Sequence, residues 1–252
     1  MMRLLLPVLV AGVALSAAAQ PATPRTEIEA GAEREHLTRG LPDWSSRFVL
    51  IEHRDAAGRV AYGGWRNTER YGLRDHELHG GGYLPLAPSL QLQAEAGASG
   101  SHRVLSRHYG LVGLHFQPVQ GWGLSGGLRR AGYDAGNTGV INLGVEHYTG
   151  NERFAYTLFA GGPDGAALTS THRLQWSHYY GDHDWFGIVF ASGRETEHDG
   201  SGAFITSRVS NLGLAGRQGL AKGLALKWEV GRQRQGELYT RSGLRLGLRF
   251  AF

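Results

Sequence analysis

The stretch Leu244-Arg-Leu-Gly-Leu-Arg-Phe-Ala-Phe252 alternates between apolar residues and residues that are charged or small. A period of two residues is that of a β-strand with one apolar face, whereas an amphipathic helix repeats every 3.6 residues. The stretches Leu224–Val230 and Leu90–Ala98 show the same alternation. Because no long stretch has the apolar spacing of an amphipathic helix, the sequence predicts an all-β protein.

Alternating runs continue along the chain from Thr26, and most are followed by Gly, Pro, Asn or Asp, which favour turns. We expect a single antiparallel barrel of about 14 strands, with about 12 or 16 as alternatives, because boundaries read from sequence shift by several residues. The expected strands are 26–34, 43–54, 59–70, 73–84, 89–98, 107–117, 122–131, 138–149, 152–161, 168–180, 184–195, 203–217, 222–234 and 238–252.

The connections between these strands alternate in length. Short ones such as Thr149–Asn151 and Gly219–Gly223 follow every second strand, and longer polar ones such as Ala98–Ser106 and Tyr133–Gly139 mostly lie between them. Short turns at one end and long loops at the other are typical of a transmembrane β-barrel. A soluble barrel or sandwich would alternate in the same way with its apolar face turned inward. The alternation therefore does not separate a soluble from a membrane barrel, and the two ends of the chain are the features that do.

The beginning of the chain indicates export. Arg3 precedes an apolar run from Leu4 to Leu15, and Ala17 and Ala19 form an A-x-A cleavage site, which is the pattern of a secretory signal peptide. We expect residues 1–19 to be a signal peptide and residues 20–252 to be one barrel domain. The chain has no cysteine, which excludes disulfides, C-x-x-C redox chemistry and thiolate zinc sites and fits a bacterial exported protein.

In a membrane barrel the apolar face of each strand meets lipid and the alternate face meets the lumen. Here the alternate face is acidic in the early strands and basic in the late ones, and closure of the barrel would bring Glu27 and Glu29 beside Arg245 and Arg249. Two interpretations remain open: a field across the lumen that orients polar solutes, or a ladder of ion pairs that closes the seam. The predicted lumen-lining residues are Glu27, Glu29, Asp75, Glu77, Glu95, Arg129, Arg153, Arg173, Lys227, Glu229, Arg245 and Arg249.

The final strand resembles the sorting signal of bacterial outer-membrane proteins, which ends in Phe and has apolar residues at every second position. The resemblance implies the bacterial outer membrane as the location and the barrel-assembly machinery as a partner. The residues that carry it are Leu244, Leu246, Leu248, Phe250 and Phe252.

Four further segments resemble the YaiO family of outer-membrane β-barrel proteins: Pro42–Trp44, Glu69–Asp75, Ser101–Leu105 and Leu238–Arg249. The resemblance runs over most of the chain, from about Glu29 onward. It implies an outer-membrane barrel. Because some relatives are encoded beside genes for surface polysaccharide, it also implies polysaccharide-export components as partners. The family brings no established catalytic or ligand residues.

Two glycine-rich motifs and one histidine are candidates for chemistry. Gly123–Gly127 matches G-x-S-x-G around Ser125, and Gly121–Gly126 matches G-x-G-x-x-G, but both lie in an expected strand and lack the following helix that each motif needs. His115 would face the lumen or its rim, and the sequence places no serine beside it. We therefore expect no catalytic, cofactor-binding or metal-binding residues, no cofactor and no enzymatic activity.

The leading functional expectation is a passive conduit for hydrophilic solutes or surface polysaccharide. The alternatives are a closed structural or lipid-binding barrel and a lipid-modifying enzyme. Outer-membrane lipid and lipopolysaccharide are expected partners, and Arg34, Arg39, Arg103 and Arg107 at expected loop ends suit an anionic lipid by their charge. The formal charge of +4 is scattered over the strands, so no nucleic-acid partner is expected.

Overall fold

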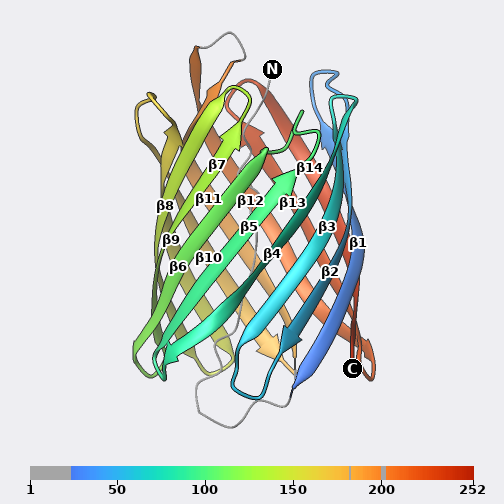
Figure 1. Cartoon of the computed structure of the whole chain (residues 1–252), viewed down its shortest axis with the longest axis vertical. Coiled ribbons are helices and arrows are strands. Elements are labelled where there is room, and N and C mark those ends of the chain that lie inside the picture. Colours follow the sequence, from blue (N-terminus) through green and yellow to red (C-terminus); the bar gives the residue numbers. More distant parts are fainter. Residues whose placement is uncertain (1–23, 182, 200–202) are drawn as a thin grey trace.

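A computed structural model describes residues 24–181, 183–199 and 203–252, and the expected signal peptide lies outside these ranges. The described residues form a closed antiparallel barrel whose strands are inclined to the barrel axis (Figure 1). The predicted fold class and the count of 14 strands are confirmed. The strands are β1 (Arg25–Leu37), β2 (Trp44–Arg54), β3 (Val60–Arg70), β4 (Leu73–Ala87), β5 (Leu90–Ser99), β6 (His108–Val119), β7 (Trp122–Tyr133), β8 (Gly136–Thr149), β9 (Glu152–Pro163), β10 (Thr169–Tyr180), β11 (Asp184–His198), β12 (Phe204–Ala221), β13 (Leu224–Gln235) and β14 (Tyr239–Ala251).

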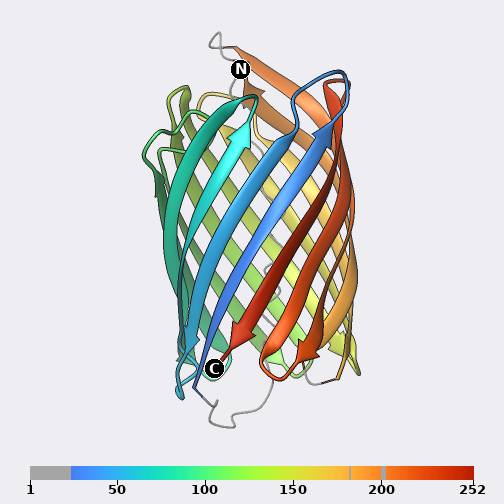
Figure 2. The ribbon, with the colours of Figure 1, turned by 90° about the vertical axis from the view of Figure 1, so that its right-hand side faces the viewer.

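The barrel closes where β1 pairs with β14, and the two strands lie side by side in Figure 2. Their register places Glu29 opposite Arg249 and Glu33 opposite Arg245. Closure satisfies the backbone hydrogen bonds of both edge strands, which a sheet within a membrane requires. It also brings together charges that are more than 200 residues apart in sequence.

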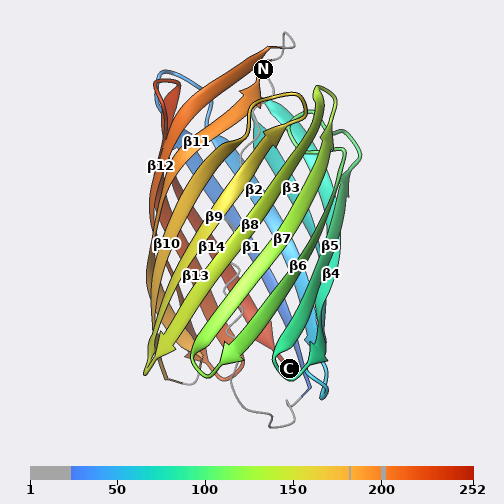
Figure 3. The same ribbon diagram turned by 90° about the vertical axis from the view of Figure 1, so that its left-hand side faces the viewer.

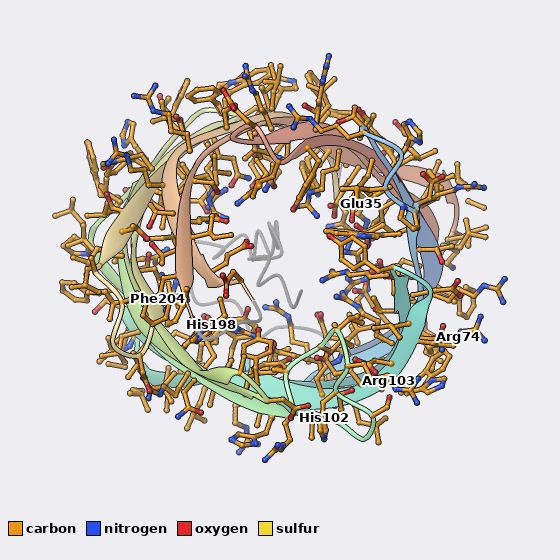
Figure 4. The ribbon with its side chains drawn as sticks, turned by 90° about the horizontal axis from the view of Figure 1, so that it is seen from above. Glu35, Arg74, His102, Arg103, His198 and Phe204 are labelled. Carbon is orange, nitrogen blue, oxygen red and sulfur yellow. The ribbon has the colours of Figure 1, made fainter. Side chains whose placement is uncertain are left out.

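Each strand has one outward and one inward face, as its period of two residues dictates. The outward face carries a band of exposed apolar side chains, for example Leu248 at 53% and Leu143 at 59% exposure, and the inward face is mostly polar or glycine. Figure 4 shows the two directions at the upper rim, where Glu35 points into the barrel and Arg74 points away from it. This arrangement suits a barrel surrounded by lipid, and none of the described residues forms a helix able to cross a membrane.

Turns at the end that holds the start of β1 and the end of β14 are mostly short, and those at the other end include the loops 100–107, 164–168 and 199–203. The short-turned end is therefore the periplasmic one. The expected long loop at Tyr133–Gly139 is wrong, because only residues 134–135 separate β7 from β8. Gly136 has a φ of +133°, which glycine tolerates, and this lets the chain reverse direction within two residues. The hairpin of β11 and β12, by contrast, rises above the neighbouring strands (Figure 3).

Glycines on the inner face make room for large neighbours. A Cβ on Gly31 would lie 2.5 Å from the ring of Phe48, and one on Gly97 would lie 2.4 Å from the ring of Tyr109. Both rings can therefore lie flat along the wall and do not project into the lumen.

The outer face is hollowed over β3 to β7. A depression of about 780 Å³ lies there, lined largely by small or apolar residues that include Ala61, Gly82, Ala94 and Val112. It belongs to the lipid-facing wall.

Candidate functional site

The inner wall of the barrel is the candidate site, and the structure places every predicted lumen-lining residue on the inward face of its strand. Most of these residues alternate with outward neighbours that are more exposed, and many of those neighbours are apolar or small. Within this set the charged side chains fall into a cluster at the seam, an arc of arginines on β7 to β10, and an acidic group on β4 and β5.

The seam cluster is centred on Glu29, whose side chain is only 2% exposed. Its carboxylate lies 2.9 Å from Lys227 Nζ, 3.6 Å from Arg249 and 3.7 Å from Arg245. A buried carboxylate is tolerated when cations and hydrogen bonds compensate its lost hydration. The contact with Lys227 reaches past β14 to β13, so the cluster joins three strands of the wall.

The ion pairs continue in both directions from this centre. Arg249 also pairs with Glu27 and, at 3.1 Å, with Glu52 on β2. Toward the extracellular end, Arg241 lies 2.9 Å from Glu35. The geometry therefore forms the ion-pair ladder that closes the seam, and the charges of Glu27, Glu29 and Glu35 on β1 are compensated locally.

The expected division into acidic early strands and basic late strands has exceptions on both sides. Arg66 and Arg70 lie on the inner face of β3, and Glu146 and Glu195 lie on the inner faces of β8 and β11. Charges of both signs therefore occur on the inner faces of both the early and the late strands. The seam, where a field across the lumen would have originated, is largely neutralised.

In the arc on β7 to β10, two cations rest on aromatic rings and have no carboxylate partner among the described residues. The guanidinium of Arg129 lies 4.5 Å from the ring centre of Tyr109, and that of Arg173 lies 5.1 Å from the ring centre of Phe159. Neither arginine forms an ion pair among the described residues. Arg153, between them, is paired with Glu146 at 2.7 Å.

The acidic group on β4 and β5 is engaged by neutral donors. Glu95 accepts hydrogen bonds from the hydroxyls of Tyr62, at 2.6 Å, and Tyr109, at 2.7 Å. Asp75 is fully buried, and its carboxylate accepts backbone N–H groups from the loop 100–107. Asp75 therefore holds a loop in place and does not present its charge to the lumen. The third acidic residue of this group, Glu77, lies 3.9 Å from the ring nitrogen of His79.

Water reaches much of this wall. The side chains of Glu229, Lys227 and Glu52 face inward, yet they are 33%, 28% and 27% exposed to solvent. In Figure 4 the inward side chains of the described residues line the wall and leave the middle of the barrel clear of side chains. A pocket of about 130 Å³ among Glu33, Arg66 and neighbouring residues extends this wetted surface at the seam.

The motif candidates also have defined positions. Ser125 lies within β7 on the inner face, and its register partner across the strand pair is His115. Sequence reasoning missed this juxtaposition, which only the β6–β7 register reveals. No hydrogen bond joins the two side chains in the described part of the chain, and the His115 ring nitrogen lies 3.3 Å from Gln93 Oε1. Within the same ranges no three His, Asp or Glu residues are grouped as metal ligands.

Some inner residues were not predicted, among them Tyr62, Glu52 and Arg66. In β3 both faces carry a large aromatic residue, because Tyr62 faces inward and Trp65 faces outward. The sequence alternation of this strand therefore does not show which face is the inner one. Glu52 shares its parity with inward residues of β2, so the alternation of that strand was the signal that could have revealed it.

A closed antiparallel barrel with an apolar outer band and a wetted, charged lumen defines a membrane β-barrel protein. Solved structures share this fold: the CymD monoaromatic hydrocarbon channel (TM-score 0.56, 8% identity, covering 90% of this chain and 87% of that one), OmpF of Salmonella typhi in complex with daunomycin (0.54, 8%, 91% and 97%), and a bacterial polysaccharide outer membrane secretin (0.52, 10%, 90% and 98%). At these identities the likeness concerns the fold alone. No curated protein matches the sequence.

The family is shown by a direct match. Residues 25–198 match the YaiO membrane beta barrel domain, so the chain belongs to the YaiO family, and it is a β-barrel of the bacterial outer membrane. Three of the four segments that carried the resemblance lie within the matched residues, and Leu238–Arg249 lies beyond them.

Proposed function

We propose that this protein is a passive conduit for hydrophilic solutes across the outer membrane. The observation that carries the proposal is the partial exposure of charged side chains on the inner wall, such as Glu229 at 33% and Lys227 at 28%. In a barrel filled by its own side chains, these groups would be packed and dry. Barrels of 8 strands are filled in this way and those of 16 to 18 strands leave aqueous channels, and a barrel of 14 strands lies between them.

The conduit needs no reacting group, so the proposal includes no catalytic residue and no cofactor. Charged side chains of both signs replace part of the hydration of a passing solute, and the ion pairs among them keep any one site from holding it tightly. We include surface polysaccharide among the candidate solutes because one fold neighbour is described as a polysaccharide secretin.

We also propose that the outward residues of β14 are what the outer-membrane assembly machinery recognises. Leu244, Leu246, Leu248 and Phe250 form one apolar face, with exposures from 44% to 53%. An unfolded chain would present this face as a continuous apolar strand.

The first experiment measures single-channel conductance of the protein, purified from outer membranes, in a planar bilayer. We expect discrete current steps with measurable ion selectivity, and a reduction of current when oligosaccharides of increasing size are added. Heat-modifiable gel migration shows that the barrel is folded. Absence of current from a folded barrel would overturn the conduit and favour the closed structural or lipid-binding barrel. Open channels that oligosaccharides do not block would remove polysaccharide from the candidate solutes.

A further inference from the structure

Four outward arginines form a basic patch on one side of the barrel: Arg194 on β11, Arg208 on β12, and Arg232 and Arg234 on β13. All four are exposed and lie toward the extracellular ends of their strands. The patch lies directly above the lipid-facing band. On the same outward faces, the residues nearer the periplasm are apolar and exposed, for example Phe190, Leu212 and Val230. The patch therefore sits where the apolar part of the membrane ends.

The register places these cations against one another. Arg194 is the direct cross-strand partner of Arg208, and Arg234 is opposite Ser210, which makes it a diagonal neighbour of Arg208. Directly opposed side chains on one face of an antiparallel pair are separated by roughly 5 Å at Cβ, and like charges in this position destabilise the sheet. An arrangement that repels itself calls for an anion between the guanidinium groups.

The described part of the chain supplies no such anion. Among the described residues the four arginines form no ion pair, and the one side-chain hydrogen bond of the patch runs from Arg234 Nε to the carbonyl oxygen of Gly236 at 3.1 Å. Glu237, in the adjoining turn, forms no ion pair with them in the same part of the chain.

Arg39 and Arg103, also at this rim, have no ion pair among the described residues, but four other exposed arginines there are each paired with a carboxylate. These pairs are Arg34 with Asp43 at 3.2 Å, Arg74 with Glu69 at 2.7 Å, Arg107 with Asp134 at 2.8 Å, and Arg130 with Asp164 at 2.7 Å. Arg34 and Arg107, which the sequence alone suggested for contact with an anionic lipid, are thus already compensated within the protein.

We propose that the basic patch binds the phosphate groups of an outer-leaflet glycolipid, the lipid A part of lipopolysaccharide. Guanidinium groups match phosphate oxygens with paired charge-assisted hydrogen bonds, and one phosphate between Arg194 and Arg208 would replace their repulsion by two attractions. The apolar band below the patch favours a lipid over free phosphate, because acyl chains attached to the same headgroup would lie against Phe190 and Leu212.

The test compares binding of defined lipid A species to the detergent-solubilised full barrel by native mass spectrometry. The variant R194Q/R208Q removes the opposed pair, and R74Q/R130Q is a matched control that removes two paired arginines from the same rim. We expect bisphosphorylated lipid A to bind the first variant about tenfold or more weakly than the parent barrel and to bind the control unchanged. R232Q/R234Q serves as a second variant and should weaken binding in the same direction.

Three results would overturn the proposal. The first is unchanged affinity in R194Q/R208Q, with folding shown by heat-modifiable migration. The second is equal binding of dephosphorylated lipid A, which would reduce the patch to an apolar surface. The third is full displacement of lipid A by millimolar inorganic phosphate, which would indicate a site for free anions. Conductance of the variants is measured separately, so a result that overturns lipid A binding does not contradict the proposal that the barrel is a conduit.

Discussion

One residue type, arginine, serves three different purposes in this barrel, and its surroundings distinguish them. At the outer rim Arg74 is paired with Glu69 in an exposed contact. On the inner wall Arg249 is only 13% exposed and is shared among several carboxylates. Arg173 rests on the ring of Phe159 and has no carboxylate partner among the described residues. Exposed pairs contribute little to stability, whereas breaking a buried pair leaves a charge without compensation.

The substitution Arg249→Gln tests the seam ladder. It removes the cation that Glu27 and Glu52 share and leaves Glu29 with a weaker set of partners. We expect the free energy of unfolding to fall by roughly 3 kcal/mol, because carboxylates that stay in the seam lose their counter-charge. Urea unfolding in detergent, followed by tryptophan fluorescence, measures the change.

The control for this substitution is Arg47→Gln. Arg47 is exposed on the outward face of β2 and has no ion pair among the described residues, so its loss should change stability by less than about 0.5 kcal/mol. Equal effects of the two substitutions would show that the seam contributes nothing beyond general charge.

At the scale of elements, the loop 100–107 is held at several points along its span. Val104 and Leu105 donate their backbone N–H groups to Asp75 at 2.7 and 2.8 Å. On either side of them, His102 and Arg107 contact Asp134 in the turn between β7 and β8. The loop is therefore tied to the rim by carboxylates from two different hairpins, and its order depends on their ionisation.

This dependence predicts a response to acid. The hydrogen bond that Arg107 donates is the main cause that holds the pKa of Asp134 below its ordinary value. A depressed pKa in the folded protein means that the contact stabilises the loop at neutral pH and that this stabilisation is lost as the pH falls through the folded-state pKa. Hydrogen exchange of residues 100–107 should therefore accelerate relative to the strands as the pH is lowered below 4. Asp134→Asn should show the fast exchange already at neutral pH, and unchanged exchange in that variant would contradict the prediction.

The sequence was sufficient for the strands because their period of two residues survives on the lipid face, where Leu244, Leu246 and Leu248 recur without interruption. Turn lengths were harder to predict from the sequence, since Gly136 allows a two-residue reversal where a longer loop was expected. The ion pairs of the inner wall were only partly predictable from the sequence. Parity shows that Lys227 and Glu29 share the lumen, but their 2.9 Å contact spans an intervening strand and depends on the stagger of the whole barrel.

At the scale of the whole molecule, the lumen has two kinds of charged region, one in which the charges are paired and one in which cations are in excess. The seam combines carboxylates and cations in contact, so it contributes little net field to a passing ion. The arc on β7 to β10 carries Arg129, Arg153 and Arg173 on its inner face against the carboxylate of Glu146. Ion selectivity is therefore expected to depend on the arc, while stability depends on the seam.

The double variant Arg129→Gln/Arg173→Gln separates these two roles. Both arginines face the lumen without an ion pair among the described residues, so their removal takes positive potential from the path of an ion and leaves no carboxylate without its partner. We expect the cation-to-anion permeability ratio, measured from reversal potentials in a salt gradient, to rise by about twofold. The variant Arg47→Gln/Arg232→Gln removes the same formal charge from the outer wall and should leave that ratio unchanged. If both variants shift the ratio equally, selectivity follows the total charge of the protein, and the inner arc has no special part in it.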